Sequence, residues 1–144
     1  MKRIAISVTS AVIAAGALTA CGGDSGYCDS IKDFDKDFGK ISQTDATSAD
    51  FKKATDAIDN IAEESPDSVK KEWETLGAKL GAVNKALDEA GLKVEDLRDQ
   101  AKVQKVDKTK IAKVTKAAQG MSEANTAQAK ITKQVKKECN ITLK

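Results

Sequence analysis

Apolar residues recur at alternating spacings of three and four along most of the chain, which is the period of amphipathic α-helices. The longest ladder has spacings of 4, 3, 4, 3 and 4 and consists of Val69, Trp73, Leu76, Leu80, Val83 and Leu87. It follows Ser65-Pro66-Asp67, where the serine suits a cap, the proline the first helical position and the aspartate the helix dipole. Gly91 suits the end of this helix, because glycine readily adopts a left-handed conformation.

Two shorter apolar stripes precede this ladder and predict two further helices. The first stripe consists of Tyr27, Ile31, Phe34, Phe38 and Ile41. The second consists of Phe51, Ala54, Ile58 and Ile61. The polar residues 42–47 separate the two stripes, and Thr47-Ser48-Ala49-Asp50 offers a cap followed by an acidic first turn.

A long last helix is expected from near Asp107 to near Cys139. Its broad apolar side consists of Ile111, Val114, Ala118, Met121, Ala124, Ile131, Val135 and Cys139. Gly120 in its middle indicates either a bend or a close contact with a neighbouring helix. Residues 92–106 have no clear pattern, although Val94–Arg98 can form a short helical turn.

None of these four helices can bury its apolar stripe alone, and packing against one another in an antiparallel bundle is the simplest solution. The chain holds only one Trp, one Tyr and three Phe, and it is rich in alanine and lysine. This composition favours helices over a sheet. We therefore expect an all-α fold, an antiparallel bundle of about four helices over residues 27–144.

The start of the chain has a different character. Met1-Lys2-Arg3 is followed by an apolar run that ends in Leu18-Thr19-Ala20-Cys21. A basic start, an apolar middle and a small-residue exit are typical of a secretory signal peptide. The alternative is a transmembrane helix, but the 17 residues from Ile4 to Ala20, with their serines and threonines, are at the short limit for spanning a bilayer.

The sequence Leu18-Thr19-Ala20-Cys21 resembles the lipobox of bacterial lipoprotein precursors. The resemblance covers only about the first 21 residues. It implies cleavage after Ala20, a diacylglyceryl group with fatty acids such as palmitate on Cys21, and a lipid anchor on the extracytoplasmic face of the cell membrane. We therefore expect a removed signal peptide at 1–20, a flexible tether at 21–26 and the bundle domain at 27–144. Two acyl chains anchor a protein stably without a transmembrane helix.

Charge is segregated along the expected mature chain. Removal of Lys2 and Arg3 lowers the basic count from 24 to 22, which equals the number of acidic side chains. Residues 21–100 hold 19 acidic and 11 basic side chains, whereas residues 101–144 hold 3 acidic and 11 basic. The overall balance gives no reason to expect nucleic-acid binding, but the last helix is strongly basic.

Cys28 and Cys139 lie near the start of the first expected helix and the end of the last. Disulfides persist outside the cytoplasm, and with Cys21 lipidated the remaining cysteine count is even. An antiparallel arrangement of the first and last helices would bring these two ends together. We expect a Cys28–Cys139 disulfide that ties the two helices, and a pair of buried thiols is the alternative.

The sequence offers little catalytic chemistry. It contains no histidine, which removes the commonest general base and the usual zinc ligand. Asp33–Asp37 resembles the start of a calcium loop, but Phe38 and Thr44 stand where such a loop needs glycine and a bidentate acid. Glycine-rich phosphate loops and lysines interleaved with aromatics are also lacking. We expect no catalytic residues, no metal, no cofactor and no nucleic-acid partner, so the protein is not an enzyme.

The lysines of the last helix are the candidate binding feature. Those near its end, which would face the membrane, are Lys130, Lys133, Lys136 and Lys137. They could contact anionic lipid or another envelope polyanion, or they could be solvated residues that balance the acidic helices. The leading hypothesis is a non-catalytic interaction module of the bacterial envelope that contacts an envelope protein or polyanion. A superinfection-exclusion lipoprotein of phage origin and a purely structural envelope component are the alternatives.

Overall fold

The computed structural model describes residues 25–41 and 45–143, without the side chains of Ser25 and of residues 37–41. Every regular element in this part of the chain is helical. The elements are α1 (Ser25–Ile41), α2 (Ser48–Glu64), α3 (Asp67–Ala90), the 3-10 helix η1 (Val94–Arg98), α4 (Gln100–Gln104) and α5 (Lys108–Cys139). The predicted all-α bundle of four principal helices is confirmed.

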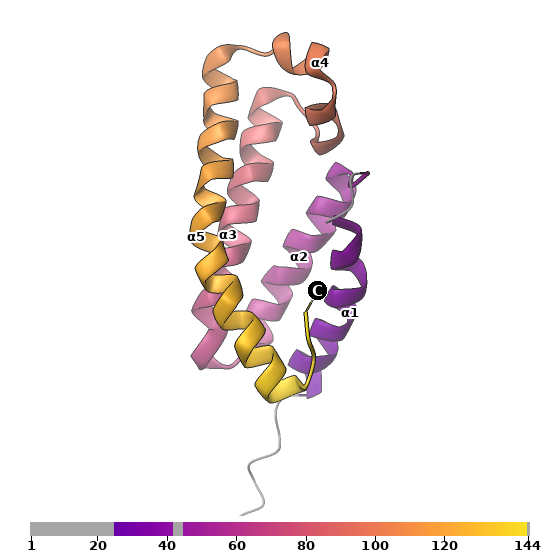
Figure 1. Ribbon diagram of the computed structural model, residues 1–144, viewed down its shortest axis with the longest axis vertical. Coiled ribbons are helices and arrows are strands. Elements are labelled where there is room, and N and C mark those ends of the chain that lie inside the picture. Colours follow the sequence, from indigo (N-terminus) through magenta and orange to yellow (C-terminus); the bar gives the residue numbers. More distant parts are fainter. Residues whose placement is uncertain (1–24, 42–44, 144) are drawn as a thin grey trace, which may run out of the picture.

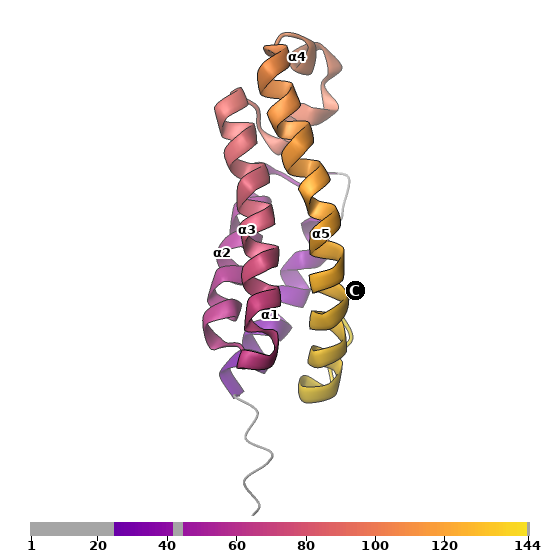
Figure 2. The same ribbon diagram turned by 90° about the vertical axis from the view of Figure 1, so that its left-hand side faces the viewer.

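The four principal helices run up and down in succession (Figure 1). α1 packs on α2, α2 on α3, and α3 forms its most extensive interface with α5, which lies beside it in Figure 2. α5 has 32 residues against 17 in α1 and in α2, so it is about 48 Å long against about 26 Å. The α3–α5 pair therefore extends beyond the other two helices, and η1 and α4 connect its far ends.

The helix ends follow from local sequence. Thr47 caps α2: its hydroxyl accepts from the Asp50 amide, while the Asp50 carboxylate accepts from the Thr47 amide at 3.0 Å. Gly91 ends α3 with a left-handed φ of 69°. The next residue, Leu92, donates its amide to the Leu87 carbonyl at 2.9 Å and is buried beside it. This is a Schellman-type end with its usual apolar contact.

The expectation that Ser65 caps α3 is wrong. Its hydroxyl donates to the Ala62 carbonyl at 2.9 Å and so satisfies the end of α2 instead. Pro66 takes the capping position, and its carbonyl accepts from the amides of Val69 and Lys70, both at 3.0 Å. The buried Ser65 hydroxyl needs an internal partner, and the last turn of α2 offers the nearer one.

Trp73 lies at the centre of the main core and has no exposed surface. Its indole Nε1 donates to the Tyr27 hydroxyl at 3.0 Å, and that hydroxyl donates to Gln134 Oε1 at 2.8 Å. Phe34 meets the indole edge-on, with ring centroids 6.0 Å apart and planes at 88°, a preferred aromatic geometry. Burial raises the pKa of the Tyr27 phenol more than the Trp73 hydrogen bond lowers it, so the phenol stays protonated and can donate. This chain connects α1, α3 and α5.

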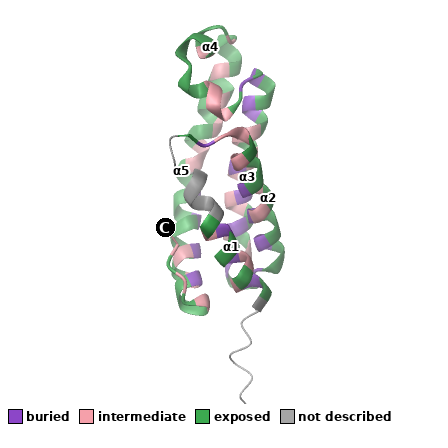
Figure 3. Ribbon diagram, turned by 90° about the vertical axis from the view of Figure 1, so that its right-hand side faces the viewer, coloured by how far each residue is buried: buried purple, intermediate pink, exposed green. Residues whose placement is uncertain are grey.

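Buried residues face the interior and exposed residues cover the outside of the helices (Figure 3). The expected stripes are largely buried, but Ala118 is exposed, whereas Ala127, which the stripe omitted, is buried. An α-helix has 3.6 residues per turn, so an apolar stripe read with alternating spacings of three and four shifts around a helix of this length. Phe38 and Ile41 belong to the first stripe, but their side chains lie outside the described part.

Gly120 does not interrupt α5, which continues through it. A Cβ at this position would lie 3.8 Å from the aliphatic Cδ of Lys79 on α3. This is an ordinary van der Waals distance, so Gly120 lies beside a side chain of α3 but the space there does not require a glycine. At the other end of the chain, α1 includes Ser25 and Gly26, which were expected in the tether, and helix boundaries commonly differ by this much.

Replacing Tyr27 with Phe should destabilise the fold, because it leaves the Trp73 indole N–H and Gln134 Oε1 buried without these partners. We expect a loss of about 1–3 kcal/mol in the free energy of unfolding, measured by urea denaturation. Thr115→Val is the control, because it removes an exposed hydroxyl that bonds only to the Ile111 carbonyl of its own helix. The control should change stability by less than about 0.5 kcal/mol. Equal stability of Y27F and the parent protein would contradict this interpretation of the core.

Candidate functional site

The disulfide joins the first and last helices as predicted. Cys28 in α1 and Cys139 at the end of α5 are bonded, with their Cα atoms 5.4 Å apart and a separation of 111 positions in sequence. Both residues are half-buried and pack against the main core. α1 and α5 otherwise make few contacts with one another. The disulfide is therefore the main connection between α1 and α5, the first and last principal helices of the bundle.

This disulfide marks the end of the bundle at which several segments meet. The start of α1, the turn between α2 and α3, and the end of α5 all lie there (Figure 1). Cys21, the predicted lipidation site, lies outside the described residues. It is only four positions before Ser25, the first residue of α1. An acyl group at position 21 would therefore hold the bundle by this end.

The four lysines predicted to contact an anionic surface lie near this end but differ in their partners. Lys130 reaches across to α3 and donates to Glu72 at 2.8 Å, and this hydrogen bond lowers the pKa of the Glu72 carboxyl. Lys137 pairs with its neighbour Glu138 at 3.0 Å. Lys133 and Lys136 are exposed and form no ion pair with the described residues. Of the four lysines, only Lys133 and Lys136 are therefore exposed cations without an ion-pair partner among the described residues.

Two further ion pairs join α3 and α5 along their length. Lys113 pairs with Glu89 at 3.1 Å, and Lys79 pairs with Glu123. Both contacts lower the pKa of the carboxyl group concerned. Such exposed pairs contribute little to stability, because solvent screens their charges. Lys113–Glu89 and Lys130–Glu72 join a base of α5 to an acid of α3, whereas Lys79–Glu123 joins a base of α3 to an acid of α5.

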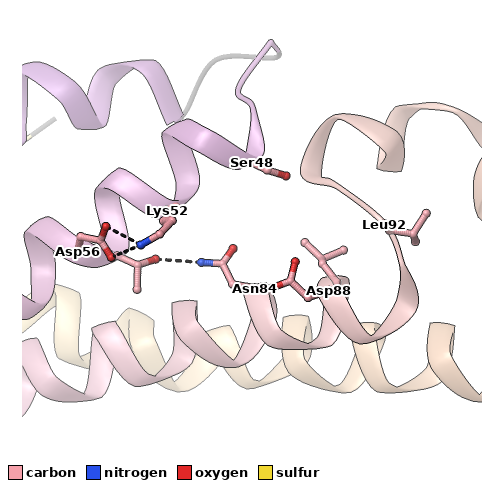
Figure 4. A pocket seen from close by; sticks show the side chains of 8 residues that line it. Ser48, Lys52, Asp56, Asn84, Asp88 and Leu92 are labelled. Atoms are coloured by element: carbon pink, nitrogen blue, oxygen red, sulfur yellow. Dashed lines mark hydrogen bonds and ion pairs between the residues drawn. The ribbon is translucent and has the colours of Figure 1, made fainter.

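A polar hollow of about 370 Å³ lies between α2, the end of α3 and the segment that follows it (Figure 4). Its polar groups are mostly engaged with one another or with the backbone. Lys52 pairs with Asp56 at 2.8 Å, Asn84 donates to the Thr55 hydroxyl at 3.1 Å, and the Ser48 hydroxyl accepts from the Val94 amide at 2.8 Å. These groups bond to one another rather than point together into the open space. The hollow is therefore part of the contact between helices and does not present a set of polar groups to a ligand.

The acidic segment Asp33–Asp37 forms part of α1, as its apolar stripe predicted. Asp33 pairs with Lys36 at 2.8 Å, and that hydrogen bond lowers its pKa. In the part of the chain that the structure describes, no group of three or more His, Cys, Asp or Glu side chains is placed to hold a metal ion. Asp33 is exposed, and residues 33–37 are helical rather than arranged as a ligand loop.

An apolar pocket of about 100 Å³ lies between α1, α3, α5 and the residues that follow α5. Its lining residues are Phe34, Trp73, Leu76, Leu80, Met121, Ala124, Asn125, Gln128, Ile131 and Leu143. Sequence periodicity identified several of these residues as core positions, but it could not show that their packing leaves a space.

The residues after α5 close one side of this cavity. Asn140 has a left-handed φ of 55°, and it turns the chain back along the space between α5 and α1 (Figure 1). Ile141 and Leu143 of this return segment pack against the main core, and Leu143 also lines the cavity. Residues 140–143 had no predicted role, because a segment this short has no readable period.

Comparison of the chain with family models, with curated proteins and with solved structures finds no match. No helix in the described residues is both long enough and apolar enough to cross a membrane. The site must therefore be interpreted from its own residues.

Breaking the disulfide should destabilise the protein strongly. In the chain-entropy model, closing a loop of this length removes about 4–5 kcal/mol of unfolded-state entropy, and few other contacts hold α5 to α1. We expect reductant to lower the melting temperature markedly, as measured by circular dichroism. The double variant Cys28→Ala/Cys139→Ala is the matched control, since its lower melting temperature should not respond to reductant. A melting temperature that is the same in reduced and oxidised protein would overturn this role.

Proposed function

We propose that this protein is a lipid-anchored, non-catalytic interaction module on the extracytoplasmic face of a bacterial cell membrane. The observation that carries the proposal is Cys21 directly after Leu18-Thr19-Ala20, behind a basic start and an apolar run. The Cys28–Cys139 disulfide supports it, because structural disulfides persist in oxidising compartments outside the cytoplasm. The short distance from Cys21 to α1 would keep the bundle close to the lipid surface.

The proposal of binding without catalysis has two supports. The chain lacks histidine, and the polar hollow of Figure 4 uses its acids, amide and hydroxyls in internal contacts rather than as a catalytic group. A rigid disulfide-closed bundle with a charged surface suits recognition of another envelope protein or of an envelope polyanion. The membrane itself is contacted through the diacylglyceryl group on Cys21.

The anchor is tested by Cys21→Ser, which removes the sulfur that would carry the diacylglyceryl group. We expect the variant to stay unprocessed or to leave the membrane fraction, while the parent protein partitions into detergent with a mass increased by the lipid. Cys28→Ser is the matched control, because it exchanges the same atoms at the disulfide and should leave membrane attachment intact. Mature-length C21S protein that still partitions fully into detergent would refute the lipid anchor.

Direct contact of the basic helix with lipid should be weak and sensitive to salt. Lys133 and Lys136 can each contribute about 1 kcal/mol at an anionic surface, but acids at the end of α2 and the start of α3 oppose them at the same end of the bundle. The full chain carrying Cys21→Ser should bind phosphatidylserine vesicles weakly at 10 mM salt and lose this binding at 150 mM, where the screening length is about 8 Å.

Vesicle sedimentation of two double variants separates a local site from general charge. Lys133→Ala/Lys136→Ala should abolish the low-salt binding, whereas Lys105→Ala/Lys108→Ala, at the far end of the α3–α5 pair, should retain it. Tight binding at physiological salt, or equal losses in the two variants, would show that these two lysines are not a distinct lipid contact.

A further inference from the structure

We infer that the apolar cavity beside Trp73 is a binding site for the end of an aliphatic acyl chain. The inference does not depend on the lipid anchor, since it concerns the interior of the bundle. It begins with the chemistry of the walls. Trp73, Leu76 and Leu80 contribute one side from α3, while Met121, Ala124 and Ile131 contribute the facing side from α5. These apolar walls favour the binding of apolar groups.

The size of the cavity selects the kind of ligand. Its volume is about 100 Å³, which is smaller than an apolar cavity of about 150 Å³ known to admit benzene. It is also far below the roughly 300–1,000 Å³ of pockets that enclose a whole drug-sized molecule. The space therefore suits the narrow end of a hydrocarbon chain, with the remainder of the ligand outside the cavity.

The polar residues of the lining indicate how the rest of such a ligand is held. Asn125 and Gln128 of α5 are exposed yet also line the cavity, so they lie where it meets solvent. Their amides can donate hydrogen bonds to a carbonyl group, and none of the described lining residues is charged. A hydrocarbon chain attached to a carbonyl, as in a fatty acid or a lipid ester, matches this combination.

The return segment Asn140–Leu143 supplies the entrance. Leu143 is part of the cavity wall, and this segment is held by apolar packing of Ile141 and Leu143. Among the described residues no hydrogen bond joins residues 140–143 to the helices. The disulfide fixes Cys139 immediately before the segment. The segment can therefore move aside about Asn140 while the bundle stays closed, and a longer acyl chain takes the place of the two aliphatic side chains.

Trp73 gives a direct and local readout, because it is the single tryptophan and has no exposed surface. Purified full-length protein is titrated with 10-bromodecanoate, whose terminal bromine quenches indole fluorescence on contact. We expect saturable quenching of Trp73, and unbrominated decanoate should compete without quenching. The cavity variants below distinguish quenching by bromine in the cavity from quenching by bromine bound elsewhere on the chain.

Two alanine substitutions on α5 separate the cavity from the surface. Ala124→Leu fills the cavity and should weaken the titration at least tenfold, whereas Ala118→Leu makes the same change at an exposed position and should leave it unchanged. Leu143→Ala enlarges the cavity and its entrance and should strengthen binding. This third variant decides the matter if circular dichroism shows that Ala124→Leu does not fold.

A second experiment identifies the source of the bound acyl chain. Vesicles of phosphatidylcholine brominated near the ends of its acyl chains replace the free acid. Quenching by these vesicles assigns the site to the acyl chain of a membrane lipid, while quenching by bromodecanoate alone assigns it to a free fatty acid. No saturable quenching from either source, or titrations that neither Ala124→Leu nor Leu143→Ala alters, would overturn the acyl-chain site.

Discussion

Trp73 can be fully buried only if three distant parts of the chain meet around it. Tyr27 from α1 accepts its indole N–H, Phe34 meets its ring edge, and Gln134 from α5 completes the hydrogen-bond chain. An indole buried without an acceptor would leave an unsatisfied donor, so α1 must approach α3 at one register. The hydrogen bonds thereby specify the register of α1 on α3, which apolar packing alone leaves adjustable.

The bundle that results is closed unevenly. α3 provides the shared surface for α2 and α5, whereas α1 and α5 meet chiefly where Cys28 and Cys139 are bonded. Between them the return segment carrying Leu143 covers part of the opening. The disulfide holds one end of the α1–α5 side of the bundle, and the apolar packing of the short return segment holds the rest of it. Stability and access to the interior are therefore carried by different contacts, which allows one to change without the other.

The charges have a double use. Lys113 and Lys130 pair with acids of α3 and so help to align the two longest helices, although exposed pairs add little stability. Lys133 and Lys136 are the exception near the disulfide end, where exposed cations lack a partner among the described residues. A helix that looked uniformly basic in sequence is thus divided into residues used inside the fold and residues left for solvent or a partner.

The sequence predicted the fold class well because helical periods, caps and breaks act locally. The ladder through Trp73, the cap at Thr47 and the left-handed end at Gly91 each depend on residues within a turn or two. Ser65 was assigned wrongly for the same reason, since two adjacent helices compete for its hydroxyl and only their final positions decide between them. The disulfide was predictable because the antiparallel order of the helices brings the start of the first and the end of the last together, where the two cysteines lie.

Other features required the tertiary structure. No period reveals that Lys130 reaches Glu72, because 58 residues separate them and their contact depends on how α3 and α5 are aligned. The cavity could not be predicted either. Leu76, Met121 and Leu143 are apolar in sequence, but the space between them depends on how closely three helices and the return segment pack together. By itself the sequence determined which residues turn inward and how the helices begin and end. The packing of those surfaces decided which charges are paired and where the interior remains unfilled, since both depend on distances between residues that are far apart in the chain.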